Sequence, residues 1–386
     1  MAKLLEITGK AISGEWGQDD DTGTGIPVLR TTNFTNEGFV NYKNVVTRSI
    51  SKKNIAEKYL RHGDVIIEKS GGSDKQPVGR VIFFEGEENK YLFNNFTGLL
   101  RVQNPEEWLP KYVFYALYAY YRNGGTRAFE NRTTGLHNLQ VDNYVKSVDI
   151  PKLSYRKQQH ICETLDHVRD AVAYRERQLT KLDELIKARF VEMFGDPYTN
   201  SKDYPLKKGE SFFKLSNGKA VPESKRLNGG IPAYGGNGIS WYTDESLFDA
   251  DTIVVGRVGF QSGNVHLVKG PLWVTDNAMY MSSCDFSQYN LTFLIELMAH
   301  VDFTKFQDAG DLKKITQRPF MQFEYLCPPL SLQNQFADFV AEVDKSKLLV
   351  GSAAAHKPFD IGFFSQKHCA TPCKRGIISS KHMIFH

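Results

Sequence analysis

The chain has 386 residues, of which 41% are hydrophobic and 24% charged, and its formal net charge is +4. This length favours two or three domains, no apolar run reaches the roughly 20 residues that span a bilayer, and the N-terminus lacks the apolar core of a secretory signal. Five scattered cysteines favour a reducing cytoplasm. The residues from Leu348 onward carry all of the net positive charge, so the charges of residues 1–347 sum to zero. The overall charge therefore does not indicate a nucleic-acid partner.

Residues 1–150 predict a first domain of mixed α and β structure. The runs DVIIE, which begins at Asp64, and GRVIFFEG, which begins at Gly79, are short, β-rich and bounded by turn residues. The aromatic run YVFYALYAYY, from Tyr112 to Tyr121, is too short to span a membrane and predicts a buried helix.

A long helix is predicted over residues 151–196, with Ser154 as its N-cap and Gly195 as its stop. Apolar residues recur there at alternating spacings of four and three, and only Arg175 and Arg189 break the pattern. This seam consists of Ile161, Leu165, Val168, Val172, Leu179, Leu182, Ile186 and Met193. The pattern is typical of a coiled-coil arm of roughly 60 Å, and a long core helix within one domain is the alternative.

The chain then begins a second copy of the same order. GIPAYGGNGI from Gly230 parallels GIPVLRTTNF from Gly25, and CPPLSLQNQF from Cys327 parallels IPKLSYRKQQ from Ile150. We therefore predict a second domain over residues 197–327, the start of a second helix over 328–347, and a divergent, irregular tail over 348–386. The expected fold class is α+β, with two similar mixed α/β domains joined by a long coiled-coil helix.

Catalytic signatures are missing from the chain. It has no phosphate-binding loop, no dinucleotide-binding glycine pattern and no Asn/Asp-Pro-Pro-Tyr/Phe run that would hold a flipped adenine. Asp64 and Glu68 leave a nuclease site as an alternative, although the usual Glu-x-Lys spacing is absent, and HCATPC, from His368 to Cys373, leaves a zinc site in the tail as another. We predict a non-catalytic chain that binds no metal or cofactor itself.

Two related domains on a stiff spacer suggest a chain that reads an extended polymer. A turn of B-DNA is about 34 Å, so an arm of roughly 60 Å can place two readers in separate groove segments. Arg reads guanine, Asn and Gln read adenine, and Lys and Thr bind phosphates, whereas each such residue taken singly could be a solvated loop side chain. The predicted DNA contacts are Arg30, Thr31, Asn33, Lys69, Arg132, Thr133, Thr134, His137, Asn138, Tyr234, Asn237, Arg257, Gln261, Asn264, Lys313 and Lys314.

Over residues 1–347 the layout resembles the specificity subunit of type I restriction–modification systems. The segments that carry the resemblance are the paired GDVII and ADTIV runs, IPAYGGNGISWYTDESLF, GRVGFQSGNVH, WVTDNAMY, and the helix starts PKLSYRKQQHICETLD and PPLSLQNQFADFVAEVD. The resemblance implies two target-recognition domains, each contacting half of a split site in double-stranded DNA. It also implies antiparallel helices that set the gap and dock methyltransferase subunits, which would bind S-adenosylmethionine, while a restriction/translocase subunit would add cleavage.

The second helix departs from this family. Only Phe336, Val340 and Val343 sustain its heptad before Gly351, so we expect it to end near Lys347. The apolar seam of the first helix would then be exposed, to be covered by a second copy of the chain or by methyltransferase helices, unless the chain is a defective form. The remaining alternatives are a stand-alone DNA-binding or adaptor protein, and a nuclease or methyltransferase whose site no motif reveals.

Overall fold

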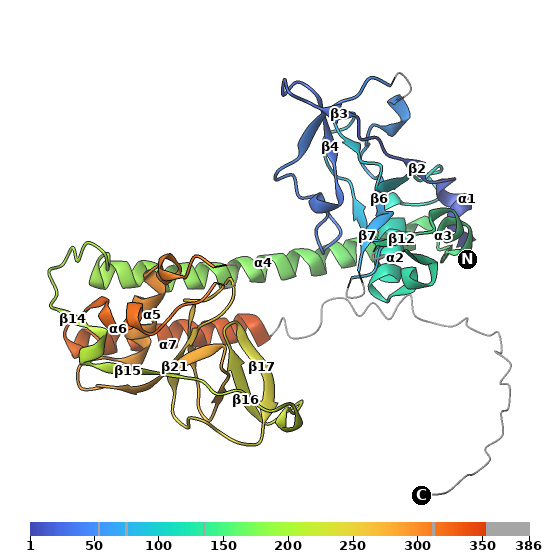
Figure 1. Cartoon of the computed structure of the whole chain (residues 1–386). Helices are drawn as coiled ribbons and strands as arrows, with labels where there is room; N and C mark the ends of the chain where they lie inside the picture. Colours follow the sequence, from blue (N-terminus) through green and yellow to red (C-terminus); the bar gives the residue numbers. More distant parts are fainter. Residues whose placement is uncertain (53–54, 74–75, 134–135, 311–312, 353–386) are drawn as a thin grey trace, which may run out of the picture. The chain divides into compact units, whose positions relative to one another are not determined.

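The computed structural model describes residues 1–52, 55–73, 76–133, 136–310 and 313–352. They form two compact units: unit 1 begins at Met1 and extends to Ala171, and unit 2 begins at Val172. The boundary falls within α4 (Tyr155–Phe194), one continuous helix of 40 residues, as the heptad pattern predicted (Figure 1). In the part of the chain described, no helix is long and apolar enough to cross a membrane.

In its described residues, unit 1 combines short strands with three α-helices besides the start of α4. Its elements are β1 (Ala2–Lys3), α1 (Leu4–Thr8), β2 (Ile12–Ser13), β3 (Gln18–Asp19), β4 (Ile26–Leu29), η1 (Thr31–Asn33), β5 (Val46–Ser49), η2 (Ala56–Lys58), β6 (Val65–Glu68), β7 (Ser70–Gly72), β8 (Val81–Phe83), β9 (Leu92–Phe93), β10 (Thr97–Leu100), α2 (Pro110–Arg122), η3 (Gly125–Phe129), β11 (Glu130–Thr133), β12 (Leu136–Leu139), α3 (Val141–Ser147) and β13 (Asp149–Ile150). The predicted aromatic helix is α2, and its residues are mostly buried.

Unit 2 begins with the C-terminal half of α4, which ends before Gly195, whose φ of 75° fits a glycine stop. Its elements are β14 (Leu206–Lys208), η4 (Gly209–Ser211), β15 (Phe213–Asn217), η5 (Glu223–Lys225), β16 (Ile231–Gly235), β17 (Gly238–Thr243), β18 (Thr252–Gly256), β19 (Val265–Val268), β20 (Trp273–Val274), β21 (Ala278–Cys284), α5 (Leu291–His300), η6 (Phe303–Phe306), α6 (Arg318–Gln322), β22 (Glu324–Leu326) and α7 (Leu330–Ser352).

The two units share one topology, which confirms the predicted internal repeat. One four-stranded sheet has a matching order in the two units, β2-β10-β6-β8 in unit 1 and β15-β21-β18-β19 in unit 2. In each unit an antiparallel pair, β4·β5 or β16·β17, is extended by a parallel strand, β9 or β20. The first and last strands of each unit also pair, as β1·β13 and β14·β22.

The central strand of each sheet is buried on both faces. In β6, Val65 and Ile67 face the core that contains α2, while Ile66 faces a second core. In β18, Ile253 faces the core that contains α5, while Val254 faces a smaller one. Because side chains alternate along a strand, a continuous apolar run fits a strand covered on both sides.

A buried glutamine near the start of α4 holds that helix to unit 1. The backbone N–H of Leu109, which precedes α2, donates to Gln158 Oε1 at 2.8 Å. Gln158 Nε2 donates to the carbonyls of Glu107 and Leu153 at 2.9 and 3.0 Å. The side chain is fully buried, so its three hydrogen bonds replace those it would make with water.

Gln333 near the start of α7 forms the same clamp in unit 2. It accepts from the N–H of Asn290, which precedes α5, and its Nε2 donates to the carbonyls of Gln288 and Pro328. Gln158 and Gln333 lie 175 residues apart, whereas the two Leu-Ser pairs matched in the sequence lie 177 apart. The sequence alignment of the helix starts was therefore out of register by two residues.

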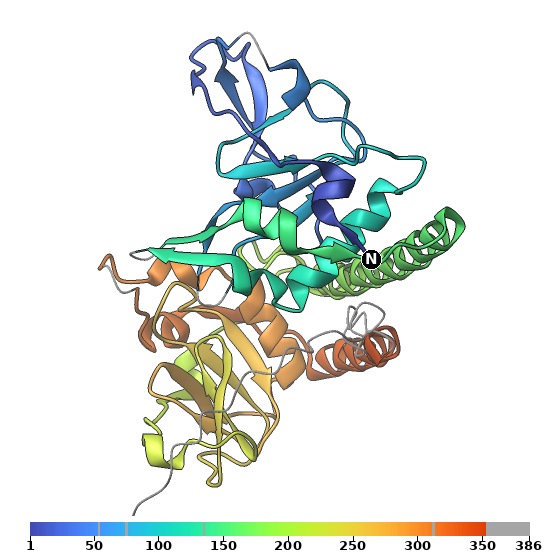
Figure 2. The same ribbon diagram turned by 90° about the vertical axis from the view of Figure 1, so that its right-hand side faces the viewer.

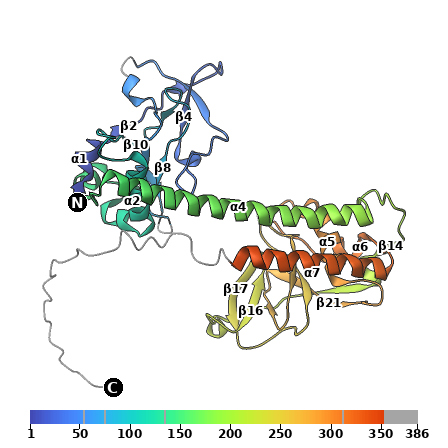
Figure 3. The ribbon, with the colours of Figure 1, turned by 180° about the vertical axis from the view of Figure 1, so that it is seen from behind.

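In unit 2, α7 lies antiparallel along the C-terminal half of α4. The two helices run side by side when the molecule is turned (Figure 2 and Figure 3). The rings of Phe190 and Phe336 lie 5.6 Å apart near one end of the pair. At the other end Arg175 Nη1 donates to the carbonyl of Val350 at 3.1 Å. The arginine that breaks the heptad thus bonds to the partner helix.

Most of the predicted seam is covered within the chain, which corrects the expectation that it would be exposed. Ile161 and Leu165 pack against the core of unit 1. Leu182, Ile186 and Met193 belong to or pack against the core of unit 2. The remaining seam residues, Val168, Val172 and Leu179, are exposed or half-buried.

Helix α7 also extends further than predicted. It continues past Lys347 through Gly351 to Ser352. A glycine in a helix costs only about 1 kcal/mol, and the bond between Arg175 and Val350 falls in this last stretch. The rest of the predicted tail, including the HCATPC segment, lies outside the described residues.

Candidate nucleic-acid interface

In unit 2 the loop that leaves strand β18 brings three predicted contacts together. Arg257 is the first residue after the strand. Gly259 N donates to the carbonyl of Lys313 at 2.8 Å, and Val258 forms an antiparallel bridge with Lys314. Among the described residues, no carboxylate forms an ion pair with Arg257, Lys313 or Lys314, so no direct contact neutralises these three cations.

The turn between β16 and β17 lies against the same loop. A Cβ added to Gly236 would stand 3.4 Å from Gly256 Cα and 3.4 Å from the carbonyl oxygen of Val258. This close approach places Asn237, the next residue, at the edge that carries Arg257. Tyr234 instead is half-buried against the smaller core of unit 2.

Two amides complete the loop after β18. Gln261 and Asn264 are both exposed. The loop is closed at its base because Gly256 N donates to the carbonyl of Asn264 at 2.9 Å and Gly263 N donates to that of Gly256 at 2.8 Å. Unit 2 therefore presents cations and amides from three separated segments along one edge.

Lys69 of unit 1 holds the position that Arg257 holds in unit 2. Lys69 N donates to the carbonyl of Phe96, and Leu139 N donates to that of Lys69, both at 2.8 Å. Arg257 makes the same two backbone bonds with the corresponding segments of unit 2, at 2.9 and 3.0 Å. Each unit thus places one cation directly after its central strand.

A second pair of predicted contacts is equivalent in the same way. Asn138 pairs with Ser70 across β12 and β7, while Lys314 pairs with Val258. Ser70 and Val258 each follow the equivalent cation by one residue. The structure therefore brings four residues that were selected separately into two matching positions.

The side chain of Lys69 has one hydrogen-bond partner among the described residues. Its Nζ donates to Ser13 Oγ at 2.8 Å. Burial, and secondarily the charge of Lys58, lower the pKa of Lys69. A nearby phosphate would favour the charged form, so this lysine is suited to gain from an approaching polyanion.

Three predicted residues of unit 1 lie around η1. Arg30 Nη2 donates to the carbonyl of Asn44, and the carbonyl of Thr31 accepts from Arg80. The amide of Asn33 is buried, accepts from Arg30 N at 3.0 Å and donates to the carbonyl of Asn41 at 3.0 Å. We therefore assign Asn33 to holding the loop, in place of the base contact that the sequence suggested.

The remaining predicted residues lie on or near the hairpin β11–β12. His137 is buried, with its Nδ1 3.3 Å from Glu130 Oε2, so its ring is not presented at the surface. Arg132 and Thr133 lie on β11. Thr134 lies outside the described residues.

The two carboxylates that suggested a nuclease site, Asp64 and Glu68, each form an ion pair with an arginine. Asp64 accepts from Arg101 Nε and Nη2, both at 2.7 Å. Glu68 accepts from Arg80 Nε and Nη2 at 3.1 and 2.9 Å. Both carboxylates are 2% exposed. Within the described ranges, no group of three or more His, Cys, Asp or Glu side chains is placed to hold a metal ion.

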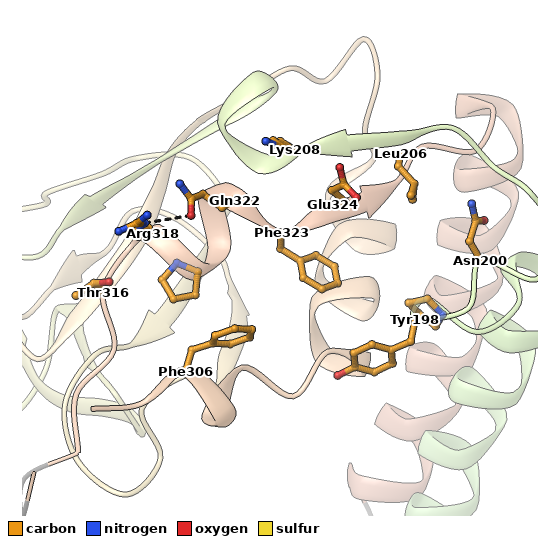
Figure 4. Close-up of a pocket in the computed structure, with 12 residues that line it drawn as sticks. Tyr198, Asn200, Leu206, Lys208, Phe306, Thr316, Arg318, Gln322, Phe323 and Glu324 are labelled. Carbon is orange, nitrogen blue, oxygen red and sulfur yellow. Dashed lines mark hydrogen bonds between the residues drawn. The ribbon is translucent and has the colours of Figure 1, made fainter. Parts of the chain in front are cut away.

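Unit 2 also contains an aromatic pocket of about 670 Å³ (Figure 4). Tyr198, Phe306 and Phe323 contribute rings to its lining, and Arg318 Nε donates to Gln322 Oε1 at 3.1 Å beside them. None of the predicted contact residues lines it. The pocket is therefore separate from the candidate interface.

One prominent side chain of the interface was not predicted. Phe260, in the loop after β18, is 92% exposed. The signal in the sequence was an aromatic residue within the polar, glycine-rich run GRVGFQSGN, where no core position is expected.

The fold is similar to those of two solved proteins of type I restriction–modification systems. A chain described as the S subunit of a type I restriction–modification system from M. genitalium superposes with a TM-score of 0.57, at 15% identity and over 91% of both chains. The chain has the fold of a type I specificity subunit. A second structure, from work on complex assembly and conformational transition of the type I system, matches with a TM-score of 0.52 and 13% identity over 92% of this chain and 93% of that one.

Sequence comparison agrees with this specificity-subunit fold. A putative type I specificity subunit of Haemophilus influenzae is 23% identical over 120 residues, which is 30% of this chain and 31% of that protein. The EcoprrI specificity subunit of Escherichia coli is 39% identical over 51 residues, 13% of each chain. The alignments thus span less than a third of these curated relatives, and no protein-family model matches the chain. The resemblance seen in the sequence is confirmed.

Proposed function

We propose that this chain is the DNA sequence-specificity subunit of a type I restriction–modification complex. In this proposal each unit reads one half of a bipartite site in double-stranded DNA, and the chain itself is non-catalytic. The observation that carries the proposal is the repeated cation, Lys69 in unit 1 and Arg257 in unit 2, each fixed by the same two backbone bonds after the central strand. A positive residue at the same place in two copies of one fold suits two contacts on one polyanion.

The chemistry of the two edges suits different kinds of DNA contact. The guanidinium of Arg257 can donate two hydrogen bonds to guanine, and the exposed amides of Gln261 and Asn264 suit adenine. Lys313 and Lys314 suit phosphates, which position the protein without specifying sequence. In unit 1, Lys69 and Asn138 take the equivalent positions.

The helices would set the distance between the two half-sites and dock the methyltransferase subunits. A continuous helix of 40 residues is roughly 60 Å long, compared with about 34 Å for a turn of B-DNA. S-adenosylmethionine would bind to the methyltransferase subunits, and cleavage would require a restriction/translocase subunit. The coverage of Ile186 and Met193 by the chain's own core leaves less apolar seam for self-association than the sequence suggested.

The proposal is tested by expressing the chain with type I methyltransferase subunits and sequencing cellular DNA for methylated adenine. We expect a motif with two specified halves separated by an unspecified spacer. The variant carrying both Lys69→Ala and Arg257→Ala should lose the motif, while Lys90→Ala, a change in an exposed turn of unit 1, should keep it. An assembled complex that methylates no such motif would contradict the proposal.

A further inference from the structure

Phe260 has the highest exposed fraction, 92%, of the large hydrophobic side chains in the described ranges. Burial of a phenylalanine side chain is favourable, so an almost fully exposed ring beside polar and charged residues is suited to a contact with a partner. The residue stands at the centre of the loop between Arg257 and Asn264, on the edge assigned above to DNA. Its exposure points to a contact made only in a complex.

The loop holds this side chain outward by a fixed backbone. Gly259 and Gly263 have φ values of 97° and 100°, a region that disfavours side chains, and they bracket the turn. Ser262 N donates to the carbonyl of Gly259 at 3.0 Å. Gln307 Nε2 donates to the carbonyl of Ser262 at 2.6 Å and reaches that of Phe260 at 3.4 Å.

The surroundings of Phe260 favour a nucleic acid as its partner. The backbone of Gly259, its neighbour, bonds to Lys313, and the adjacent Val258 bridges to Lys314. Arg257 is three residues away in the sequence. A single protruding ring among three cations is complementary to stacked bases between two phosphate backbones, because proteins insert apolar side chains between base steps from such positively charged surfaces.

We propose that Phe260 is a wedge that inserts between neighbouring base pairs of the half-site bound by unit 2, and unstacks them. This inference rests on the proposed function and adds a residue that specifies DNA deformability to those that read base edges. Among the described residues of unit 1, the equivalent position carries no ring, because Gly71 matches Gly259 in the loop register and the next residue, Gly72, is buried in β7. This residue should therefore deform the half-site bound by unit 2.

The test uses the full chain, in complex with methyltransferase subunits, and a duplex selected by that complex from a pool with random sequence. Permanganate oxidation reports unstacked thymines, and fluorescence anisotropy reports affinity. We expect wild type to expose thymines in one half-site. Phe260→Ala should abolish that reactivity and weaken binding about tenfold, since stacking of a base on an aromatic ring is worth about 1–3 kcal/mol. Phe260→Leu should retain part of both effects, since leucine also serves as a wedge.

Phe286→Ala is the matched control, because Phe286 is a second exposed phenylalanine of unit 2, at 59%. It should behave as wild type in both assays. If wild type selects no duplex at all, the proposed function fails. If wild type binds but Phe260→Ala gives the same affinity and the same permanganate pattern, the wedge is overturned while the function stands. Loss of methyltransferase association in Phe260→Ala with unchanged DNA binding would assign the ring to a protein contact, and also overturn the wedge.

Discussion

Units 1 and 2 build the same sheet around different internal chemistry. In unit 1 the central strand is bounded by Asp64, which is buried against Arg101. The register of the strands places Thr252 of unit 2 at the position of Asp64, and Thr252 Oγ1 donates to the carbonyl of Met281 at 2.7 Å. One copy thus satisfies this position with an ion pair and the other with a hydroxyl. The apolar strands therefore specify the fold, whereas a polar group at the end of a strand can be exchanged together with its partner.

The units differ most at the edges assigned to DNA. Unit 1 builds a three-stranded sheet there, with the order β11-β12-β7. In the described part of unit 2, a bridge between Val258 and Lys314 lies at the same place. A shared framework with divergent edges is what two readers of different half-sites require.

We expect the largest effect on stability where unit 1 has an ion pair and unit 2 has a hydroxyl. Asp64→Ala would leave the partly buried guanidinium of Arg101 without its carboxylate, so we expect unit 1 to lose about 3 kcal/mol of unfolding free energy. Thr252→Ala removes one neutral hydrogen bond and should cost unit 2 about 1 kcal/mol. Hydrogen–deuterium exchange under native conditions resolves the two units. Equal losses in both would show that the two positions are not differently satisfied.

The next effect tests a feature that the units share. Gln158→Ala and Gln333→Ala each remove three hydrogen bonds and leave buried backbone groups unsatisfied. We expect each to cost about 2–4 kcal/mol, and the two costs to agree within about 1 kcal/mol. Urea unfolding of both variants measures this. A large cost for one and a negligible cost for the other would refute the equivalence of the clamps.

The equivalent cations of the two units, Arg257 and Lys69, allow their effects on DNA binding to be compared. Arg257→Ala should weaken binding to the selected duplex by about 1–3 kcal/mol and relax sequence preference in one half-site only. Lys69→Ala should act on the other half-site or, if Lys69 meets a phosphate, lower the salt slope of binding by about one. Competition binding with duplexes altered in one half measures both. Loss of preference in the same half for both variants would contradict separate readers.

The smallest effect concerns pH. Glu296 in α5 corresponds to Tyr115 in α2, whose hydroxyl donates to Asp166 Oδ1 at 2.5 Å. Burial raises the pKa of Glu296. The folded state therefore holds this proton more tightly than the unfolded chain, and unit 2 loses stability as the pH rises above the ordinary carboxyl range. We expect Glu296→Gln to stabilise unit 2 by about 0.5 kcal/mol at pH 7 and by nothing at pH 4. Urea titrations at both pH values measure this, and a constant difference would rule out the carboxyl as its source.

Local patterns predicted the elements of the fold well, because they depend on neighbours in the sequence. Helix α4 begins directly after Ser154 and ends directly before Gly195, close to the predicted limits. The end of α7 was mispredicted because the contact of Val350 with Arg175 outweighs the local cost of Gly351. That contact joins residues 175 positions apart, which no local pattern contains.

The candidate site was only partly predictable for the same reason. Residue type selected Arg257 and Asn33 alike, since both are polar and close to turns. Only the packing separates them: the amide of Asn33 is used by the backbone around it, while Arg257 lies at the edge of the sheet. Phe260 was missed because exposure of an apolar residue cannot be inferred from its own hydrophobicity.

The glutamine clamp also has a mechanical consequence for unit 1. Rotation of α2 about the axis of α4 would have to break both hydrogen bonds that join Gln158 to Glu107 and Leu109, in a site closed to water. Torque applied to the recognition sheet by a bent duplex would therefore pass into the long helix instead of being lost at a hinge.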